Sequence, residues 1–142
     1  MFGEAVIVLN AEAVTDLPFV RKMNMQLASK MRFLSAQLIA LFEGDLWICN
    51  ARHANSMAAR LRSTLDQAVA AGAAPGLRFT QDTEANAVFA ALPSGAADRL
   101  REFANFYDWN AALNEVRWMC SFDTNEDEVD AFADLVLTML RA

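Results

Sequence analysis

The stretch Val116–Phe122, VRWMCSF, alternates between two kinds of side chain. Successive side chains of a strand point to opposite faces, so the stretch predicts a β-strand with two unlike faces. One face carries Val116, Trp118 and Cys120, and the other carries Arg117, Met119 and Ser121. A strand of this kind belongs to a sheet that turns one face towards a layer of helices.

The segments on either side of this strand predict an α+β domain. After Gly44 the order is helix–strand–strand–helix–strand–helix. The predicted elements are a helix over about 45–71, strands over Leu77–Thr80 and Ala87–Leu92, a helix over Ala96–Phe106, a strand or turn over Phe106–Trp109, and a final helix after a capping box at Thr124–Asp127. We therefore expect long helices followed by a small antiparallel or mixed sheet with helices on one face.

The residues before Gly44 follow another pattern. Ala5–Leu9, AVIVL, is a continuous apolar run, which is typical of a strand covered on both faces, as in a parallel sheet. The rest of this part is predicted to be helical, over Leu17–Met23 and from a Ser29 cap to about Glu43. Because no other strand precedes Gly44, we expect the apolar run to be displaced, paired with another copy or poorly ordered.

Composition and charge argue against several classes of function. The chain has 142 residues, 55% of them apolar, which suits one domain with a substantial core. Its net charge of −6 argues against general affinity for nucleic acids or anionic membranes. No segment approaches the ~20 apolar residues of a membrane span. Cys49 and Cys120 lack metal or redox spacing, so we predict buried free thiols in a protein of the reducing cytoplasm.

Basic residues concentrate where a predicted helix begins. Arg21, Lys22, Lys30 and Arg32 fall within twelve positions of a chain whose net charge is negative. Lys22, Lys30 and Arg32 could hold a phosphate together with the backbone N–H groups of the helix start. The alternative is a solvated charged turn, which is the usual meaning of such a cluster.

Arg117 is the most specific candidate for ligand binding. A guanidinium in an apolar strand loses much hydration free energy unless it meets a carboxylate or a phosphate, which it clamps with two parallel hydrogen bonds. The alternative is an ion pair with Glu115 or Asp123. His53, the only histidine, has no second ligand at metal-binding spacing, so neither a metal site nor a catalytic triad is predicted.

Four stretches in order resemble one family: RKMNMQLASKMRFLSAQL from Arg21, GDLWICNARHAN from Gly44, TEANAVFAAL from Thr83 and VRWMCSFDTNEDEVD from Val116. Together they are similar to the C-terminal portion of the threonine aldolases, pyridoxal-phosphate enzymes of the aromatic amino acid β-eliminating lyase/threonine aldolase family. The resemblance implies the fold of the aspartate aminotransferase class (fold type I). Residues 1–43 would then be a remnant of a large-domain strand plus an interdomain helical segment, and 44–142 the small C-terminal domain.

The resemblance also implies roles for three residues. Arg117 matches the family arginine that grips the substrate α-carboxylate. Arg32 matches an arginine near the cofactor phosphate and the subunit interface, and Lys22 a lysine in the same neighbourhood, so a homo-oligomer is implied. The family's Schiff-base lysine precedes the segment that Gly3–Leu9 resembles and has no counterpart here, so no catalytic residue is assigned.

Intact family members are carbon–carbon lyases that cleave β-hydroxy-α-amino acids to glycine and an aldehyde in a retro-aldol step. We expect this chain, which looks like the truncated or internally started tail of such an enzyme, to be inactive alone because the lysine is missing. One alternative is a non-enzymatic dimerisation or amino-acid-binding module derived from such an enzyme. Another is complementation, in which a separate chain supplies the lysine.

Overall fold

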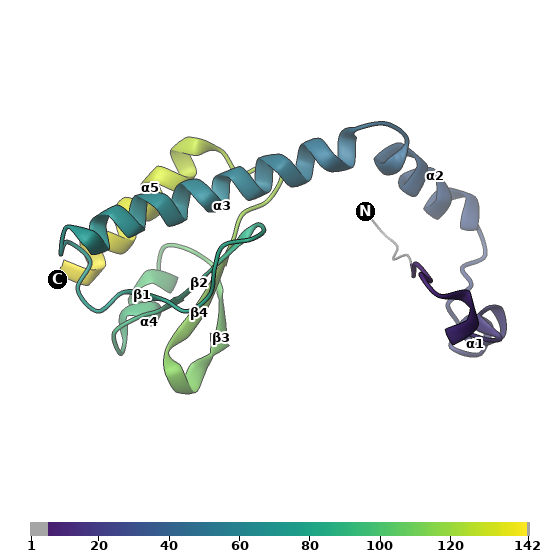
Figure 1. The fold of residues 1–142 in the computed structure, drawn as a ribbon, viewed down its shortest axis with the longest axis horizontal. Coiled ribbons are helices and arrows are strands. Elements are labelled where there is room, and N and C mark those ends of the chain that lie inside the picture. The colour runs from purple at the N-terminus through teal and green to yellow at the C-terminus, as the bar shows by residue number, and fades with distance from the viewer. Residues whose placement is uncertain (1–5, 142) are drawn as a thin grey trace. The chain divides into compact units, whose positions relative to one another are not determined.

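The structure, a computed structural model, describes residues 6–141 of the chain. The chain forms two compact units, Met1–Trp47 and Ile48–Ala142, which are described separately. The second unit combines helices with a four-stranded antiparallel sheet (Figure 1). This confirms the predicted α+β class.

The elements of the second unit follow the predicted order. They are α3 (Leu46–Ala70), β1 (Arg78–Phe79), β2 (Ala87–Ala91), α4 (Ala96–Arg101), β3 (Tyr107–Asn110), a short 3-10 helix η2 (Ala111–Leu113), β4 (Glu115–Met119) and α5 (Glu126–Arg141). The spatial order of the strands is β1-β2-β4-β3, and each pair of neighbours is antiparallel. β4 therefore lies inside the sheet, between β2 and β3.

One face of the sheet carries the core. Val88 pairs with Trp118 and Ala90 with Val116, and all four side chains are buried. Their core cluster also contains side chains of all three helices: Leu61 and Leu65 of α3, Leu100 of α4 and Val136 of α5. The helices thus cover one face of the sheet, as predicted, and the other face carries the alternate residues of each strand (Figure 1).

Two helix boundaries of the second unit differ from the predictions. α4 ends at Arg101 instead of Phe106, because the Phe106 ring makes edge contacts with Trp118 in the core, 6.2 Å between centroids, and its backbone leads into β3. The cap of α5 lies one residue later than predicted. Asn125 and Glu128 form it reciprocally, each side chain accepting a hydrogen bond from the other residue's backbone N–H at 2.9 Å.

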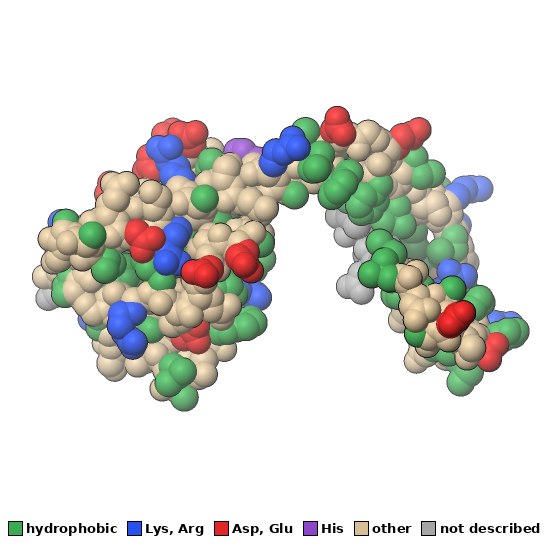
Figure 2. All heavy atoms as spheres, viewed as in Figure 1, with side chains coloured by type: hydrophobic (Ala, Val, Ile, Leu, Met, Phe, Trp, Pro, Cys, Tyr) green, Lys and Arg blue, Asp and Glu red, His purple; other side chains and the backbone are tan. Residues whose placement is uncertain are grey.

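The first unit contains a 3-10 helix η1 (Ala11–Ala13), α1 (Leu17–Met23) and α2 (Met31–Phe42). None of its described residues is buried, and Figure 2 shows hydrophobic side chains on the surface along α2. The α2 cap is Lys30, whose side chain makes no capping bond, so the prediction of Ser29 as the cap was wrong. The backbone N–H groups of the first turn of α2 thus have no side-chain cap.

The predicted strand at Ala5–Leu9 is not found. Ala5 lies outside the described residues, and Val6 to Leu9 form no strand. Their apolar side chains are exposed, Leu9 to 95%. An apolar strand of this kind needs neighbours on both edges and cover on both faces, and the described strands pair only among themselves.

Both cysteines are free thiols. Cys120 is buried as predicted, and burial raises its pKa, but Cys49 is exposed, contrary to the prediction. The exposure of Cys49 follows from its place near the start of α3, before the first buried residue of that helix, Ala54. Within residues 6–141, no helix combines the length and apolar character needed to cross a membrane.

A charged pair joins α3 to α5. Arg60 donates from Nε to Asp130 Oδ1 at 2.8 Å and from Nη2 to Asp130 Oδ2 at 2.7 Å. Its Nη1 also forms an ion pair with Glu126 Oε2 at 2.9 Å. The hydrogen bond to Arg60 lowers the pKa of Asp130 below its ordinary value. The ordinary value, about 3.9, describes the unfolded chain. The contribution of Asp130 to stability is therefore complete above that pKa and is lost as the pH falls through the lower pKa of the folded state.

We expect Asp130→Asn to lower the free energy of unfolding at pH 7 and to flatten its fall as the pH drops below about 4. Urea denaturation at a series of pH values measures both effects. The control is Asp134→Asn, an exposed position on the same helix, which should follow the wild-type curve. If the Asp130→Asn curve runs parallel to that of the wild type, the pair does not contribute to the acid sensitivity.

Candidate functional site

Arg117 stands in the middle of β4 on the face of the sheet that the helices leave open. Its neighbours in the strand, Val116 and Trp118, are buried, whereas Arg117 is half-buried and Met119 is exposed. This alternation confirms the two faces predicted from the sequence. Phe89 of β2 and Tyr107 of β3 are its Cα partners on either side, so Arg117 lies at the centre of a three-strand row.

One aromatic ring supports the Arg117 guanidinium directly, and a second ring packs against the first. The Cζ of Arg117 lies 5.5 Å from the ring centroid of Trp109, which is within the range of a cation–π contact. Trp109 in turn meets Phe89 in a T-shaped arrangement with 5.0 Å between centroids. These rings limit the positions that the guanidinium can adopt and remove water from part of its surface.

The Arg117 side chain makes no hydrogen bond or ion pair with any described residue, and its Nε is buried without a partner. The alternative of an ion pair with Glu115 or Asp123 is therefore wrong. Glu115, which is only 7% exposed, instead accepts a hydrogen bond from the Thr80 hydroxyl. A buried donor without a partner costs free energy. Because Nε has almost no exposed surface, the Nη groups are the donors that an external acceptor can reach.

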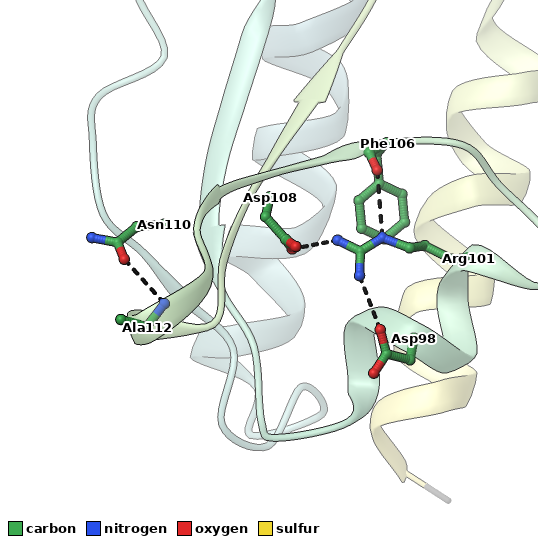
Figure 3. A network of polar contacts seen from close by, with 6 residues as sticks. All are labelled: Asp98, Arg101, Phe106, Asp108, Asn110 and Ala112. Atoms are coloured by element: carbon green, nitrogen blue, oxygen red, sulfur yellow. Dashed lines mark hydrogen bonds and ion pairs between the residues drawn. The ribbon is translucent and has the colours of Figure 1, made fainter.

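Arg101 shows what a fully paired arginine looks like in the same unit (Figure 3). It donates to Asp98 at 3.0 Å, to Asp108, and to the Phe106 carbonyl oxygen at 3.4 Å. Asp108 is the Cα partner of Val116, so it lies next to Arg117 along the sheet but alternates to the other face. Asp108, the acid of β3, therefore pairs with Arg101 on the helical face and is no partner of Arg117.

This arrangement suits a carboxylate or a phosphate. The guanidinium presents a planar fork of N–H donors, which matches two oxygens of a carboxylate. Sequence reasoning identified Arg117 but missed Trp109 and Phe89. The signal for both is an aromatic residue on a strand next to the arginine. It can be recognised only once the register of the strands is known.

The predicted phosphate site in the first unit is not enclosed. Arg21, Lys22, Lys30 and Arg32 are all exposed, and Arg32 Cζ lies 5.1 Å from the ring centroid of its neighbour Phe33. Lys22 belongs to the last turn of α1, and Lys30 and Arg32 to the start of α2. Two cations and an uncapped helix N-terminus suit an anion, but no described residue of this unit is buried around them.

His53 has a structural role. Its Nε2 lies 2.6 Å from the Thr124 carbonyl oxygen, which can only accept, so Nε2 carries the proton and donates. This bond joins α3 to the segment that leads into α5. Across residues 6–141, no group of three or more His, Cys, Asp or Glu side chains is placed to hold a metal ion.

Comparison with known proteins places this site in context. No protein-family model matches the chain. The chain is 35% identical over 141 residues to a low specificity L-threonine aldolase of Pseudomonas sp. and 36% identical over 140 residues to one of Pseudomonas aeruginosa. These alignments cover 99% and 96% of this chain but 39% and 38% of the two enzymes. The predicted resemblance to the C-terminal portion of the threonine aldolases is confirmed.

Replacing Arg117 and replacing Arg101 should change the free energy of unfolding in opposite directions. We expect Arg117→Met to raise the free energy of unfolding by up to about 1 kcal/mol, because it removes a buried donor that has no partner. The matched variant Arg101→Met should lower it by about 1 kcal/mol, because two carboxylates and a carbonyl lose their donor. Chemical denaturation measures both. A larger loss of stability in Arg117→Met than in Arg101→Met would contradict a ligand-binding role for Arg117.

Proposed function

We propose that this chain is the C-terminal part of a threonine-aldolase-like pyridoxal-phosphate lyase, in which Arg117 binds the α-carboxylate of the substrate amino acid. One observation carries the proposal. The guanidinium of Arg117, to which the family resemblance assigns carboxylate binding, lies unpaired on the open face of the sheet. The similarity to threonine aldolases over nearly the whole chain supports it.

Arg117 would act by fixing the orientation of the substrate. Two parallel hydrogen bonds hold the carboxylate in the plane of the guanidinium, which limits rotation of the bound amino acid. Trp109 supports the guanidinium from one side, so its donors are already oriented before the ligand arrives. Tyr107, which is 76% exposed beside Arg117, would form part of the surface around the substrate.

Arg32 and Lys22 are proposed to contribute positive charge near the cofactor phosphate. The chemistry of these donors fits a phosphate, but the described residues around them enclose no ring, so other residues must hold the rest of the group. When bound, pyridoxal phosphate supplies a ring that accepts electron density as the Cα–Cβ bond breaks. We propose that residues 1–43 are a remnant of a large-domain strand plus an interdomain helical segment and that residues 44–142 are the small C-terminal domain.

A non-enzymatic module is the second candidate. Exposed apolar side chains on α2, Phe33 at 58%, Ile39 at 57% and Phe42 at 53%, favour a surface that another chain covers. A homo-oligomer would satisfy this surface under either candidate. The two differ in whether the chain is part of an enzyme that acts on an amino acid or is a module that only dimerises or binds an amino acid.

Carboxylate binding can be measured directly. We expect ¹⁵N-labelled protein to bind L-threonine weakly, in the millimolar range, with shifts confined to β2, β3 and β4 around Arg117. Arg117→Lys should weaken binding by about tenfold, because the ammonium cannot form the two parallel bonds. Arg78→Lys, an exposed arginine on edge strand β1, is the matched control. Equal binding in the Arg117→Lys variant and the control would contradict the proposal.

We also expect the 142 residues taken alone to release no glycine from threonine, because their only lysines are Lys22 and Lys30. Added pyridoxal phosphate should form no Schiff base with a lysine. No visible absorption band of such an adduct should appear, and borohydride should attach no cofactor to the protein. Mass spectrometry of the reduced protein tests this. A reduced adduct mapped to Lys22 or Lys30, or glycine formed by this chain alone, would overturn the proposed inactivity. Activity restored by a second chain that supplies the lysine would support complementation.

A further inference from the structure

Trp109 meets Arg117 at an irregular step of the sheet. The pairing of β3 with β4 shifts register between Asp108 and Asn110, so Trp109 between them is the extra residue of a β-bulge. A bulge bends its strand and re-aims the side chain that it carries. Here the Trp109 ring, which is 52% exposed, lies 5.5 Å from the Arg117 Cζ on the open face.

Hydrogen bonds hold the chain on either side of Trp109 (Figure 3). On one side, the Asp108 carboxylate accepts from the Arg101 guanidinium on the helical face of the sheet. On the other side, the Asn110 side-chain oxygen accepts from the Ala112 N–H at 3.1 Å. Because both neighbours of Trp109 are bound, the backbone of the bulge is restrained, and with it the direction in which the ring points.

Phe89 of β2 restrains the Trp109 ring from across β4, which lies between β2 and β3. The two ring centroids are 5.0 Å apart and the ring planes meet at 69°, which is a favourable edge-to-face arrangement. Phe89 and Arg117 are Cα partners, so the ring pair and the guanidinium share one small area of the open face. Trp109 is therefore held both through its backbone and through its ring.

The Arg117 guanidinium can meet a ligand through only one of its edges. A carboxylate can approach the edge that contains Nε or the edge formed by the two Nη groups, because both carry paired N–H donors. Nε is buried, whereas Nη1 and Nη2 keep exposed surface and make no hydrogen bond with a described residue. Which edge faces outward depends on the rotation of the planar group, and the Trp109 ring limits that rotation by covering one of its faces.

We infer that Trp109 is the positioning residue of the carboxylate site: it holds the Arg117 guanidinium so that its two Nη groups, and not Nε, meet the ligand. This inference rests on the carboxylate-binding role proposed for Arg117. Trp109 acts through Arg117. A guanidinium that is already positioned loses less freedom when the ligand binds, which strengthens binding without a new contact. The bulge and the bonds of Figure 3 thus contribute to the affinity of a site on the opposite face of the sheet.

NMR titration of the ¹⁵N-labelled full chain with L-threonine tests the inference. Trp109→Leu keeps an apolar side chain but removes the ring, so the dissociation constant should rise about two- to fivefold. Trp109→Phe keeps a ring and should stay within about twofold of the wild type. The control is Phe122→Leu, which removes an exposed ring outside the strands and should bind like the wild type. Equal dissociation constants for Trp109→Leu and the wild type would overturn the inference and leave the proposed function in place.

The Arg117 side-chain signals give a readout that a change in stability alone would not produce. In the wild type, L-threonine should shift the Nη signals of Arg117 more than its Nε–H signal, because Nε is buried. Hydrogen exchange of Nε–H should be slow in the wild type and at least about twofold faster in Trp109→Leu, because the guanidinium is no longer held. Asp108→Ala, which frees one side of the bulge from the helical face, should change the exchange in the same direction.

Three outcomes count against the inference, and they differ in what else they affect. A larger shift of Nε–H than of the Nη signals in the wild type would overturn it without the need for any variant. Unchanged exchange in both Trp109→Leu and Asp108→Ala would also overturn it. If the wild type binds no L-threonine, the proposed function is overturned and this inference with it, and the exchange rates then show only whether Trp109 holds the guanidinium.

Discussion

β2 and β4 pair without interruption, from Ala87 opposite Met119 to Ala91 opposite Glu115. A shift of this register by one residue would move every side chain of β4 to the other face. It would place the Arg117 guanidinium in the core and expose the Trp118 ring to water. The core and the position of Arg117 therefore depend on the same pairing, and the burial of Val88, Val116 and Trp118 keeps that pairing in place.

The same alternation explains why an acidic chain keeps one arginine unpaired. Asp108 alternates to the helical face, where Arg101 binds it, and Glu115 on the face of Arg117 accepts the Thr80 hydroxyl. Sequence distance alone would have paired Arg117 with Glu115, two residues away in the strand. Each of these two acids instead has its own donor, and the Arg117 guanidinium lies over the Trp109 ring, which supports a cation without neutralising it.

Local patterns predicted the strand and its two faces, because the alternation in VRWMCSF depends only on neighbouring side chains. They could not predict Trp109 as a partner of Arg117. The pairing of β3 with β4 shifts register between Asp108 and Asn110, so Trp109 is the extra residue of an irregular step, and such a step re-aims a side chain. The contact of Phe106 with Trp118 likewise joins segments whose proximity only the tertiary fold creates, and it ended α4 earlier than propensity indicated.

The two units differ in what stabilises them. The second has a core shared by the sheet and three helices, whereas no described residue of the first is buried. α1 has 7 residues and α2 has 12, and isolated helices shorter than ~12–15 residues are marginal in water. Hydrophobic burial within the first unit therefore contributes little to its stability. Its apolar and basic side chains have the composition of a surface that a partner covers, which agrees with the place proposed for it beside a cofactor domain.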